Sequence, residues 1–468
     1  MEGIVDLITS IDSVMGGIIL VIMLGGIGLF FTIRLGFVQF VNFHRAFKEM
    51  FGGIFGKGEG EGEGSLSSFQ ALSTAVAAQV GTGNVGGVAT AIATGGPGAV
   101  FWMWLTALVG MATNFAEAVL AQVYRVRQDD GEYVGGPAYY MTRGLGKKNM
   151  PIAKFMAAFF AVAIILALGF SGNMVQSNSI AASLNTAFTI PTWVSGAILA
   201  LLAGFIFIGG VQRIGKFAET VVPVMAILYI IGSIVLLIKN ASNIGPAFQA
   251  IFQGAFSPQA AAGGFAGAVV KEAIRMGVQR GLFSNEAGMG STPHAHAVAT
   301  VSHPAKQGLV AMCGVFIDTI VVCSTTALSI IATNAHQQSD RKAVQITMYA
   351  FEQGFGDIGA KFLAICLMFF AFTTIIGWYY FGESNIRYLF GTGALMPYRI
   401  IVVLCIFLGA LAEVDFVWAI NGLLNNLMVY PNVVALLVLS PVVVKVYKDY
   451  RQKHKSGEPM VYDYKQHN

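Results

Sequence analysis

Long apolar runs, separated by short polar breaks, recur along the whole chain and constrain its fold more than any other feature. A helix needs about 20 apolar residues to cross the hydrocarbon core of a bilayer. About eleven runs qualify as such spans, with approximate ranges 14–34, 68–94, 98–124, 151–187, 191–210, 217–238, 262–302, 307–332, 359–388, 398–412 and 416–444. The sequence therefore predicts an all-α integral membrane protein with about eleven transmembrane helices.

The composition supports a single membrane domain over residues 1–468. Hydrophobic residues make up 55% of the chain and charged residues 11%, whereas soluble domains carry about 25% charged residues. The first run has no small-residue cleavage site before Arg34 and Arg45, so we expect a retained helix and no secretory signal. Cysteines lie only in apolar runs, where packing between helices is the expected role: Cys313, Cys323, Cys366 and Cys405.

Lysine and arginine gather in one set of alternate loops and in the C-terminal tail, whereas the opposite set holds mainly Lys239, Arg341 and Lys342. Cytoplasmic loops of membrane proteins carry the excess of positive charge. This predicts a cytoplasmic C-terminus and an outside N-terminus, which carries Glu2 and Asp6. The Gly/Glu-rich stretch 56–65 is expected to be a flexible linker, and an amphipathic external helix that acts as a lid is expected from Arg341 onward.

Glycine-rich breaks interrupt two of the apolar runs. The second run contains "AAQVGTGNVGGVAT" and the seventh contains "GVQRGLFSNEAGMGSTP". A break inside a membrane is tolerated only where protein or a water-filled cavity satisfies the backbone, and transporters use broken helices to bind ions and substrates. Close helix packing through small residues is the alternative for the glycines.

The first break also holds the spacing G-x-G-x-x-G, which in soluble enzymes suggests a dinucleotide. That site needs a preceding strand and an acidic residue about 20 positions later. Here apolar helical sequence flanks the glycines, and the first acidic residue after them is Glu117, in the next span. The spacing therefore does not predict nucleotide binding.

Each broken run opens a block of five spans. Spans 2–6 begin inside and spans 7–11 begin outside, which is the pattern of an inverted repeat. We expect repeats over 68–240 and 241–446, an extra N-terminal helix and linker over 1–67, and a cytoplasmic tail over 447–468.

The segments "GTGNVGGVATAIATGGPGAVFWMW" and "GLFSNEAGMGSTPHAHA" resemble the alanine/glycine:cation symporter family, within the amino acid–polyamine–organocation superfamily, and the resemblance covers nearly the whole chain. It implies a LeuT-type 5+5 fold with one extra N-terminal helix. It also implies sodium-coupled uptake of small neutral amino acids such as alanine or glycine, across a prokaryotic cell membrane, with no organic cofactor.

The resemblance assigns roles within the first break. Backbone amides of Thr82 and Gly83 would face the substrate carboxylate, and carbonyls of Ala77 and Val80 would face a sodium ion. Two further candidate residues lie beside them: Gln79, which reaches either ligand or forms a helix–helix hydrogen bond, and Asn84, a candidate for a second cation.

The ninth span carries the adjacent hydroxyls of Thr373 and Thr374, which match the hydroxyl pair of the sodium site in this fold, with the carbonyl of Phe370 one turn earlier. Hydrogen bonding within their own helix is the alternative for such a pair. Trp378 lies four positions after Thr374, on the same face, and would wall a small side-chain pocket.

The fourth span is unusually polar for a membrane segment, and such residues are often functional. Phe170 is expected to form an aromatic wall and Gln176 to hydrogen-bond the substrate, with helix packing as the alternative for each. Asn173 shares a face with Gln176.

In the seventh span, carbonyls around Phe283 and Ser284 would bind the substrate ammonium, with Asn285 beside them, and Met289 would line the pocket. For Glu286, three roles stay open: balancing the ammonium, capping the second half-helix, or pairing with Arg275 or Arg280.

Other ionisable residues are less informative. Asp318 lies mid-span and is open to binding a proton or a cation, while Glu117 and Glu383 lie nearer cytoplasmic ends. Two groups are expected to be structural or to line a water-filled access path: the histidines His294, His296 and His303, and the cluster Lys271, Glu272, Arg275 and Arg280.

We expect a sodium-coupled secondary transporter, with proton coupling or an uncoupled channel or facilitator as the alternatives. No ring-forming filter sequence favours a channel, and no catalytic set favours an enzyme. The expected partners are a small neutral amino acid, sodium and the lipid bilayer, without nucleic acid; the sequence leaves the substrate and the oligomeric state open, a monomer included.

Overall fold

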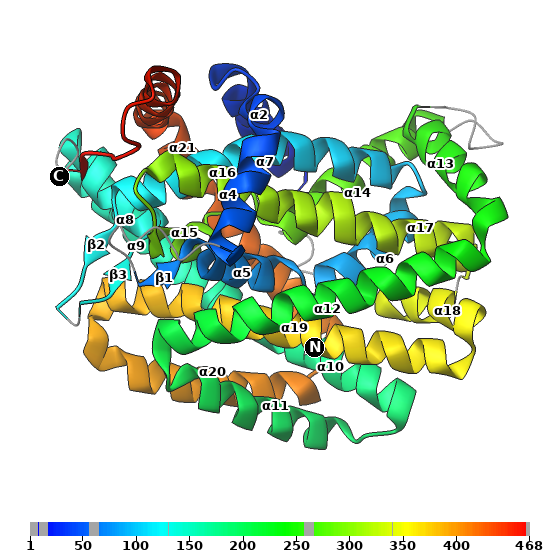
Figure 1. The fold of residues 1–468 in the computed structure, drawn as a ribbon. Helices are drawn as coiled ribbons and strands as arrows, with labels where there is room; N and C mark the ends of the chain where they lie inside the picture. The colour runs from blue at the N-terminus through cyan, green and yellow to red at the C-terminus, as the bar shows by residue number, and fades with distance from the viewer. Residues whose placement is uncertain are drawn as a thin grey trace.

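The structure is a computed structural model that describes residues 8, 17–55, 65–129, 131–256, 266–338 and 340–464. Its long helices lie side by side, and two short strand pairs lie near one end (Figure 1). The predicted all-α architecture is confirmed. Residues 2 and 6, the linker 56–64 and the first residues of the runs 14–34 and 262–302 lie outside the described residues.

In the first half of the described chain, three helices (α2, α3 and α4) precede the first broken run, and long helices follow it. The elements are α2 (Ile18–Arg34), α3 (Val38–Val41), α4 (Phe43–Phe55), β1 (Leu66–Ser67), α5 (Ser68–Gln79), η1 (Gly83–Gly87), α6 (Val88–Gly95), α7 (Ala99–Val123), β2 (Val126–Arg127), β3 (Tyr133–Val134), α8 (Pro137–Gly144), η2 (Leu145–Lys147), α9 (Met150–Ile164), η3 (Ile165–Gly172), α10 (Asn173–Phe188), α11 (Thr192–Phe207) and α12 (Gly210–Lys239).

The second half contains the second broken run, followed by four further long helical stretches. The elements are α13 (Ala241–Phe256), α14 (Ala266–Asn285), α15 (Pro293–Ala297), β4 (Ala299–Thr300), α16 (Pro304–Val315), η5 (Phe316–Cys323), α17 (Ser324–Ala332), η6 (Ala335–Gln337), α18 (Val344–Phe355), α19 (Asp357–Phe390), η7 (Thr392–Ala394), α20 (Leu395–Leu411) and α21 (Val414–Ser456).

Seven helices in the described residues are long and apolar enough to cross a membrane, and two shorter apolar helices accompany them. The seven are Ala99–Val123, Met150–Phe188, Gly210–Lys239, Pro304–Ala332, Asp357–Phe390, Thr392–Leu411 and Trp418–Ser456; the shorter two are Ile19–Arg34 and Thr192–Phe207. The two runs that contain the glycine-rich breaks are not among these helices. Each of them forms shorter helices on either side of its break.

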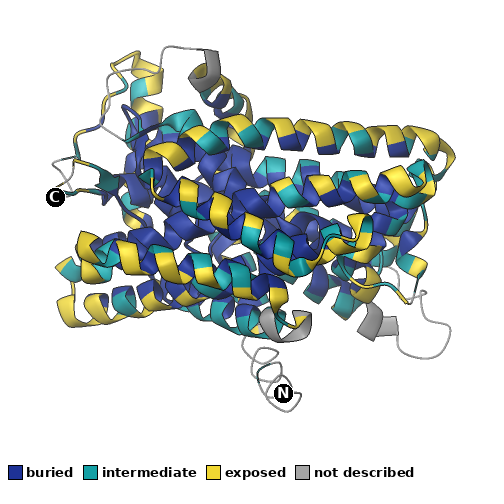
Figure 2. Ribbon diagram, turned by 90° about the horizontal axis from the view of Figure 1, so that it is seen from below, coloured by how far each residue is buried: buried dark blue, intermediate teal, exposed yellow. Residues whose placement is uncertain are grey.

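Large apolar side chains cover the outer helices, while buried residues fill the centre (Figure 2). On α11 and α12, Leu201 is 74% exposed and Ile238 is 67% exposed. So many exposed apolar side chains would be unstable in water and are stable against lipid. Together with the long helices, this surface identifies a multi-pass membrane protein.

A parallel strand pair joins the two broken runs near one end of the molecule. β1 pairs with β4 in the register Leu66 with Ala299. At the end of β1, the side chain of Ser67 accepts the backbone N–H of Gln70, and the Gln70 side chain accepts the N–H of Ser67. This reciprocal cap starts α5 and so fixes where the first half-helix begins.

The structure contains elements that the apolar runs did not predict. The helix α13 follows α12, and π-helical segments interrupt the fourth and eighth runs at η3 and η5. The last helix, α21, continues to Ser456, so residues predicted as tail extend a membrane helix. The helix predicted from Arg341 onward is present as α18, which starts at Val344.

Candidate functional site

The first break frees two backbone carbonyls. In a continuous helix the N–H of Gly81 would bond the carbonyl of Ala77, but here it donates to Oδ1 of Asn84 at 2.9 Å. Likewise, the N–H of Asn84 donates to the carbonyl of Gly81 at 3.3 Å and not to that of Val80. The carbonyls of Ala77 and Val80 are therefore available to other partners.

Those two carbonyls face the hydroxyl of Thr374 on α19. Its Oγ1 lies 3.1 Å from the oxygen of Ala77, 3.2 Å from that of Val80 and 3.0 Å from that of Phe370. The hydroxyl of Thr373 also donates to Phe370, at 2.8 Å. Both predicted hydroxyls therefore bond within their own helix, which was the alternative to a sodium site. Thr374 also contacts the carbonyls of the first break.

Glycine at position 81 makes this approach possible. A Cβ atom there would lie 2.5 Å from Oγ1 of Thr374 and 3.2 Å from Oε1 of Gln176. Any other residue would push the two helices apart at the break.

The second break bends the chain through three left-handed residues between α14 and α15. Glu286, Gly288 and Gly290 have φ angles of 57°, 85° and 82°. Glycine adopts this conformation without strain, but a glutamate does so only when its surroundings impose it.

Glu117, on α7, holds the second break in this shape. Its fully buried carboxylate accepts the N–H groups of Gly288 and Gly290, each at 2.9 Å, and the side-chain amide of Asn432 at 2.8 Å. Asn432 also donates to the carbonyl of Gly288 at 2.9 Å and accepts the hydroxyl of Tyr140. The sequence placed Glu117 near a cytoplasmic helix end and gave no sign of this role.

The same arrangement frees carbonyls of the second break. In a continuous helix the N–H groups of Ala287 and Gly288 would bond the carbonyls of Phe283 and Ser284. Ala287 instead donates to Oδ1 of Asn285 at 3.1 Å, and Gly288 donates to the carboxylate on α7. The carbonyls that the resemblance assigned to the substrate ammonium are therefore without their helical donors.

The two breaks contact each other. Gln79 donates its side-chain amide to the carbonyl of Asn285 at 2.6 Å, while its own Oε1 is buried without a hydrogen-bond partner in the described residues. A Cβ atom on Gly83 would lie 3.5 Å from Cα of Ser284. Candidates predicted from spans 2 and 7 are therefore in contact with each other.

Gln176, on α10, lies against the first break. Its Oε1 accepts the N–H of Thr82 at a long 3.3 Å, and the hydroxyl of Thr82 is buried without a partner in the described residues. Asn173 is not part of this contact, since its amide donates to the carbonyl of Gly169 within its own helical stretch.

The aromatic candidates lie farther around the site. The indole of Trp378 packs against Gly172, where a Cβ would lie 2.7 Å from its ring, and donates its N–H to Glu286 at 2.6 Å. Phe170 is half-buried, and its ring centroid lies 5.7 Å from that of Tyr398.

Glu286 does not pair with Arg275. Arg275 instead forms a bidentate contact with Glu272 on the adjacent turn. Glu286 accepts the hydroxyl of Ser291 at 2.5 Å and the indole of Trp378. Of the roles left open for Glu286, pairing with Arg275 is therefore wrong. The second break turns the carboxylate of Glu286 toward Trp378 on α19.

Asp318 lies at the centre of a polar cluster that sequence reasoning missed. Its carboxylate accepts the amide of Asn84 at 2.5 Å, the hydroxyl of Ser284 at 3.1 Å and that of Thr319 at 2.7 Å. The thiol of Cys323 lies 3.3 Å from both Asn84 and Ser284. One aspartate therefore binds both breaks, and its isolation in an apolar run was the available signal.

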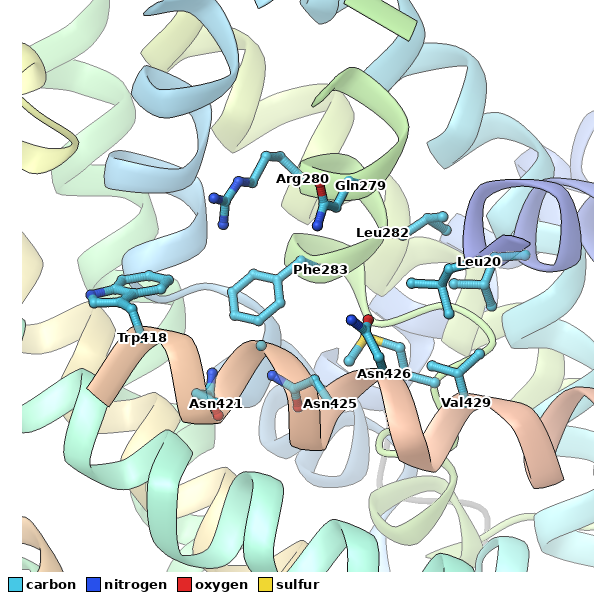
Figure 3. Close-up of a pocket in the computed structure, with 13 residues that line it drawn as sticks. Leu20, Gln279, Arg280, Leu282, Phe283, Trp418, Asn421, Asn425, Asn426 and Val429 are labelled. Atoms are coloured by element: carbon cyan, nitrogen blue, oxygen red, sulfur yellow. The ribbon is translucent and has the colours of Figure 1, made fainter. Parts of the chain in front are cut away.

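The predicted pocket residues Phe283 and Met289 line a cavity of about 130 Å³ between α14, α21 and α2 (Figure 3). A larger cavity of about 710 Å³ lies beside η1 and the start of α18. Trp418 and Arg280 border both cavities.

At the β1–β4 pair, away from the two cavities, side chains and the segment after α21 cover the ends of the broken helices; we call this region the closed end. Beside the β1–β4 pair, the side chains of Gln122 and Arg125 donate to the carbonyl of Ala299 at 3.0 and 2.8 Å. The segment after α21 packs on the same region, where Tyr462 donates its N–H to the carbonyl of Ser302. The guanidinium of Arg125 lies 5.1 Å from the ring centroid of Tyr464.

Each histidine of the seventh and eighth runs has its own protein partners. His294 contacts the carbonyl of Ser291, His296 contacts Gln307, and His303 contacts Asp449 at 3.0 Å. Across the described parts of the chain, no group of three or more His, Cys, Asp or Glu residues is arranged to hold a metal ion. Glu383 pairs with Arg387 and Arg399.

Known proteins resemble the chain over nearly its full length. Residues 1–464 match the family described as "Sodium:alanine symporter family". A sodium/alanine symporter of Methanococcus maripaludis is 42% identical over 97% of this chain and 98% of its own length. An amino-acid carrier protein of Bacillus subtilis is 42% identical over 92% of this chain and 89% of its own length.

Among solved structures, the protein MhsT in complex with L-phenylalanine has a TM-score of 0.54 and 14% identity, over 82% of this chain and 98% of its own length. At that identity the likeness concerns the fold alone, and it agrees with the LeuT-type fold that the resemblance implied.

Proposed function

Since this chain belongs to the sodium:alanine symporter family, we propose that it couples sodium movement to the uptake of a small neutral amino acid such as alanine or glycine. The protein is a transporter and not an enzyme. The proposed cycle is alternating access, in which the site between the two breaks opens first to one side of the membrane and then to the other.

The observation that carries this proposal is the surplus of carbonyl oxygens around Thr374. A hydroxyl has one proton and donates to one acceptor at a time. Three carbonyl oxygens, those of Ala77, Val80 and Phe370, surround it within 3.2 Å. Oxygen ligands of this kind are the ones that hard cations prefer. We therefore assign sodium to these three carbonyls and the hydroxyls of Thr373 and Thr374.

The substrate would lie between the breaks. Its carboxylate would take the backbone N–H groups of Thr82 and Gly83, displacing the long contact to Gln176. Its ammonium would take the freed carbonyls of Phe283 and Ser284. Six further residues would border it: Gln79, Phe170, Gln176, Asn285, Met289 and Trp378. Glu286 would balance the ammonium charge.

Proton coupling is the second candidate, and the Asp318 cluster favours it over an uncoupled facilitator. The carboxylate of Asp318 bonds Asn84 in the first break and Ser284 in the second break. Its charge state would therefore affect both breaks. The same oxygens would serve a second cation at Asn84 if the carboxylate stays ionised.

The proposed topology has eleven spans, with repeats over 68–240 and 241–446, an extra helix and linker over 1–67 and a tail beyond residue 446 in the cytoplasm of a prokaryotic cell. The basic loop residues support it, since Arg387 pairs with Glu132, which lies between β2 and β3, and these strands lie near one end of the molecule (Figure 1). Lys239 instead contacts the carbonyl of Gly354, at the end of α18.

The test is uptake of labelled alanine and glycine by proteoliposomes that contain the purified protein. An inward sodium gradient should drive accumulation above equilibrium, and an inward proton gradient without sodium should not. Accumulation with the proton gradient alone would instead show proton coupling, for which Asp318 is the candidate residue. Equilibration without accumulation under either gradient would contradict symport.

A further inference from the structure

The cavity of about 130 Å³ beside the second break has an unusual lining of side-chain amides (Figure 3). Asn421 and Asn425 lie four positions apart on α21, so they share one helix face, and Gln279 faces them from α14. A single water molecule takes about 30 Å³ in the liquid, so the cavity has room for a short polar side chain.

Two of these amides have hydrogen-bonding atoms without partners. Asn425 is only 3% exposed, and neither its nitrogen nor its oxygen has a hydrogen-bond partner in the described residues. Asn421 is 1% exposed; its oxygen accepts the hydroxyl of Ser171 at 3.2 Å, while its nitrogen has no such partner there. Buried polar atoms in folded proteins are nearly always paired, so these amides point to a ligand that the cavity receives.

The cavity lies next to the proposed substrate site. One side of the Phe283 ring borders the cavity. Its other side lies close to the first break, since a Cβ on Gly83 would lie 3.6 Å from the ring. Trp418 closes the cavity toward the larger one, with its ring centroid 6.3 Å from that of Phe283. A substrate held between the breaks therefore needs only a shift of Phe283 to extend its side chain into the cavity.

The unpaired atoms define the chemistry of that side chain. Asn425 offers one group that donates and one that accepts. A carboxamide or a hydroxyl can do both in return, whereas a carboxylate only accepts and an ammonium only donates. The apolar side chains of Leu20, Leu282 and Val429 lie in the same lining and favour an uncharged group. Arg280 also borders the cavity, and its side chain has an interaction of its own within the protein.

We propose that this amide cavity receives the side chain of a neutral polar amino acid, with serine, asparagine and glutamine as the class, and that Asn425 determines their selection over alanine. The proposal rests on the proposed function, because the same site binds the amino-acid backbone. Alanine and glycine leave the cavity unused.

The test measures how serine, asparagine, glutamine and unlabelled alanine compete with uptake of labelled alanine in proteoliposomes. Asn425→Leu keeps the branched shape of the side chain and its number of heavy atoms but removes its hydrogen-bonding atoms. We expect the inhibition constants of the polar amino acids to rise about tenfold, which corresponds to one lost hydrogen bond, while that for alanine changes less than about twofold.

Val429→Ala is the matched control, since Val429 lines the same cavity, one turn along α21, without an amide. It should leave the preference between polar amino acids and alanine unchanged. If Asn425→Leu does not fold, Asn425→Ala removes the same atoms without adding bulk, and the same shift is expected.

Equal inhibition constants in the wild type and Asn425→Leu would overturn the proposal and leave the cavity as a water-filled space. An equal rise of the inhibition constants for alanine and for the polar amino acids would also overturn the proposal, because the amide of Asn425 would then serve folding alone. Absence of sodium-driven alanine uptake in the wild type would instead count against the proposed function.

Discussion

The hydroxyl of Thr374 lies 3.1 Å from the carbonyl oxygen of Ala77, although 297 positions separate the two residues in the chain. The contact joins the long helix α19 to the end of the first half-helix. It depends on the absence of a side chain at Gly81 and on the side chain of Asn84, which takes the N–H that Ala77 would otherwise bond.

Removal of this hydroxyl should weaken sodium dependence. Thr374→Val keeps the shape of the side chain and deletes one of the proposed ligands, so the sodium concentration for half-maximal alanine uptake should rise at least about tenfold. Thr373→Val should have a smaller effect in the same direction, because Thr373 bonds Phe370 but not the first break. Thr220→Val, on the exposed side of α12, serves as the control. An unaltered sodium titration in Thr374→Val would contradict the assigned ion site.

Shortening of Trp378 should admit larger amino acids. The indole packs on Gly172 and donates to Glu286, so Trp378→Ala opens space beside the second break. We expect leucine and phenylalanine to compete with alanine uptake about tenfold more strongly than in the wild type. Trp378→Phe keeps most of the ring but loses the N–H, and it should leave the size preference nearly unchanged. If competition by leucine stays as in the wild type, Trp378 does not limit the pocket.

Neutralisation of Glu117 should loosen the second break without touching the substrate. Glu117→Gln replaces an accepting oxygen by a donating amide, which leaves the N–H of Gly288 or Gly290 unpaired in a buried place. An unpaired buried group costs about 1 to 3 kcal/mol, so the unfolding temperature and the maximal uptake rate should both fall. Glu458→Gln, on an exposed segment, should change neither. Normal stability and uptake in Glu117→Gln would show that the break holds without this carboxylate.

His303 should make stability sensitive to acid. It caps α16 by accepting the N–H of Ala305 at Nδ1 and donates from Nε2 to Asp449, which requires the neutral ring. Burial lowers the pKa of His303 to about 4 from its ordinary 6.5. Between those values the unfolded chain binds more protons than the folded one, so stability falls as the pH drops below about 6.5, by up to about 2 kcal/mol at pH 5.

The measurement is the unfolding temperature between pH 7.5 and pH 5 for the wild type and His303→Asn. Asparagine is a good helix cap that does not titrate in this range. The variant should therefore lose less stability than the wild type on acidification, and identical pH profiles would exclude His303 as the cause.

The sequence predicted the two breaks because glycine, asparagine and polar residues inside membrane-length runs are costly in lipid unless protein or a cavity satisfies the backbone there. The position of Thr374 followed from the resemblance, and the structure places it against the first break. The roles of Glu117 and Asp318 could not be predicted, because each depends on contacts with residues far away in the chain: Asp318 bonds Asn84 across 234 positions.

The sequence also did not predict the π-helical segments or the helix α13. Apart from Asp318, the π-helical segments η3 and η5 consist of residues that ordinary membrane helices also contain, so the sequence predicted helices there but not their π-helical hydrogen bonds. The helix α13 was missed because Asn243 and Pro246 interrupt its apolar pattern, and a proline inside a helix normally disfavours it, yet α13 contains Pro246 in its interior.

The length of α21 gives the molecule a mechanical property. The helix continues from Trp418, at the amide cavity, to Asp449, which contacts His303 beside the closed end. At a rise of about 1.5 Å per residue, this separation is about 45 Å. A tilt of about 5° at one end of such a rod displaces the other by about 4 Å. Pro431 and Pro441 lie between the two ends, so a movement of α21 that starts at the cavity reaches the other end only as far as the helix stays straight at these prolines.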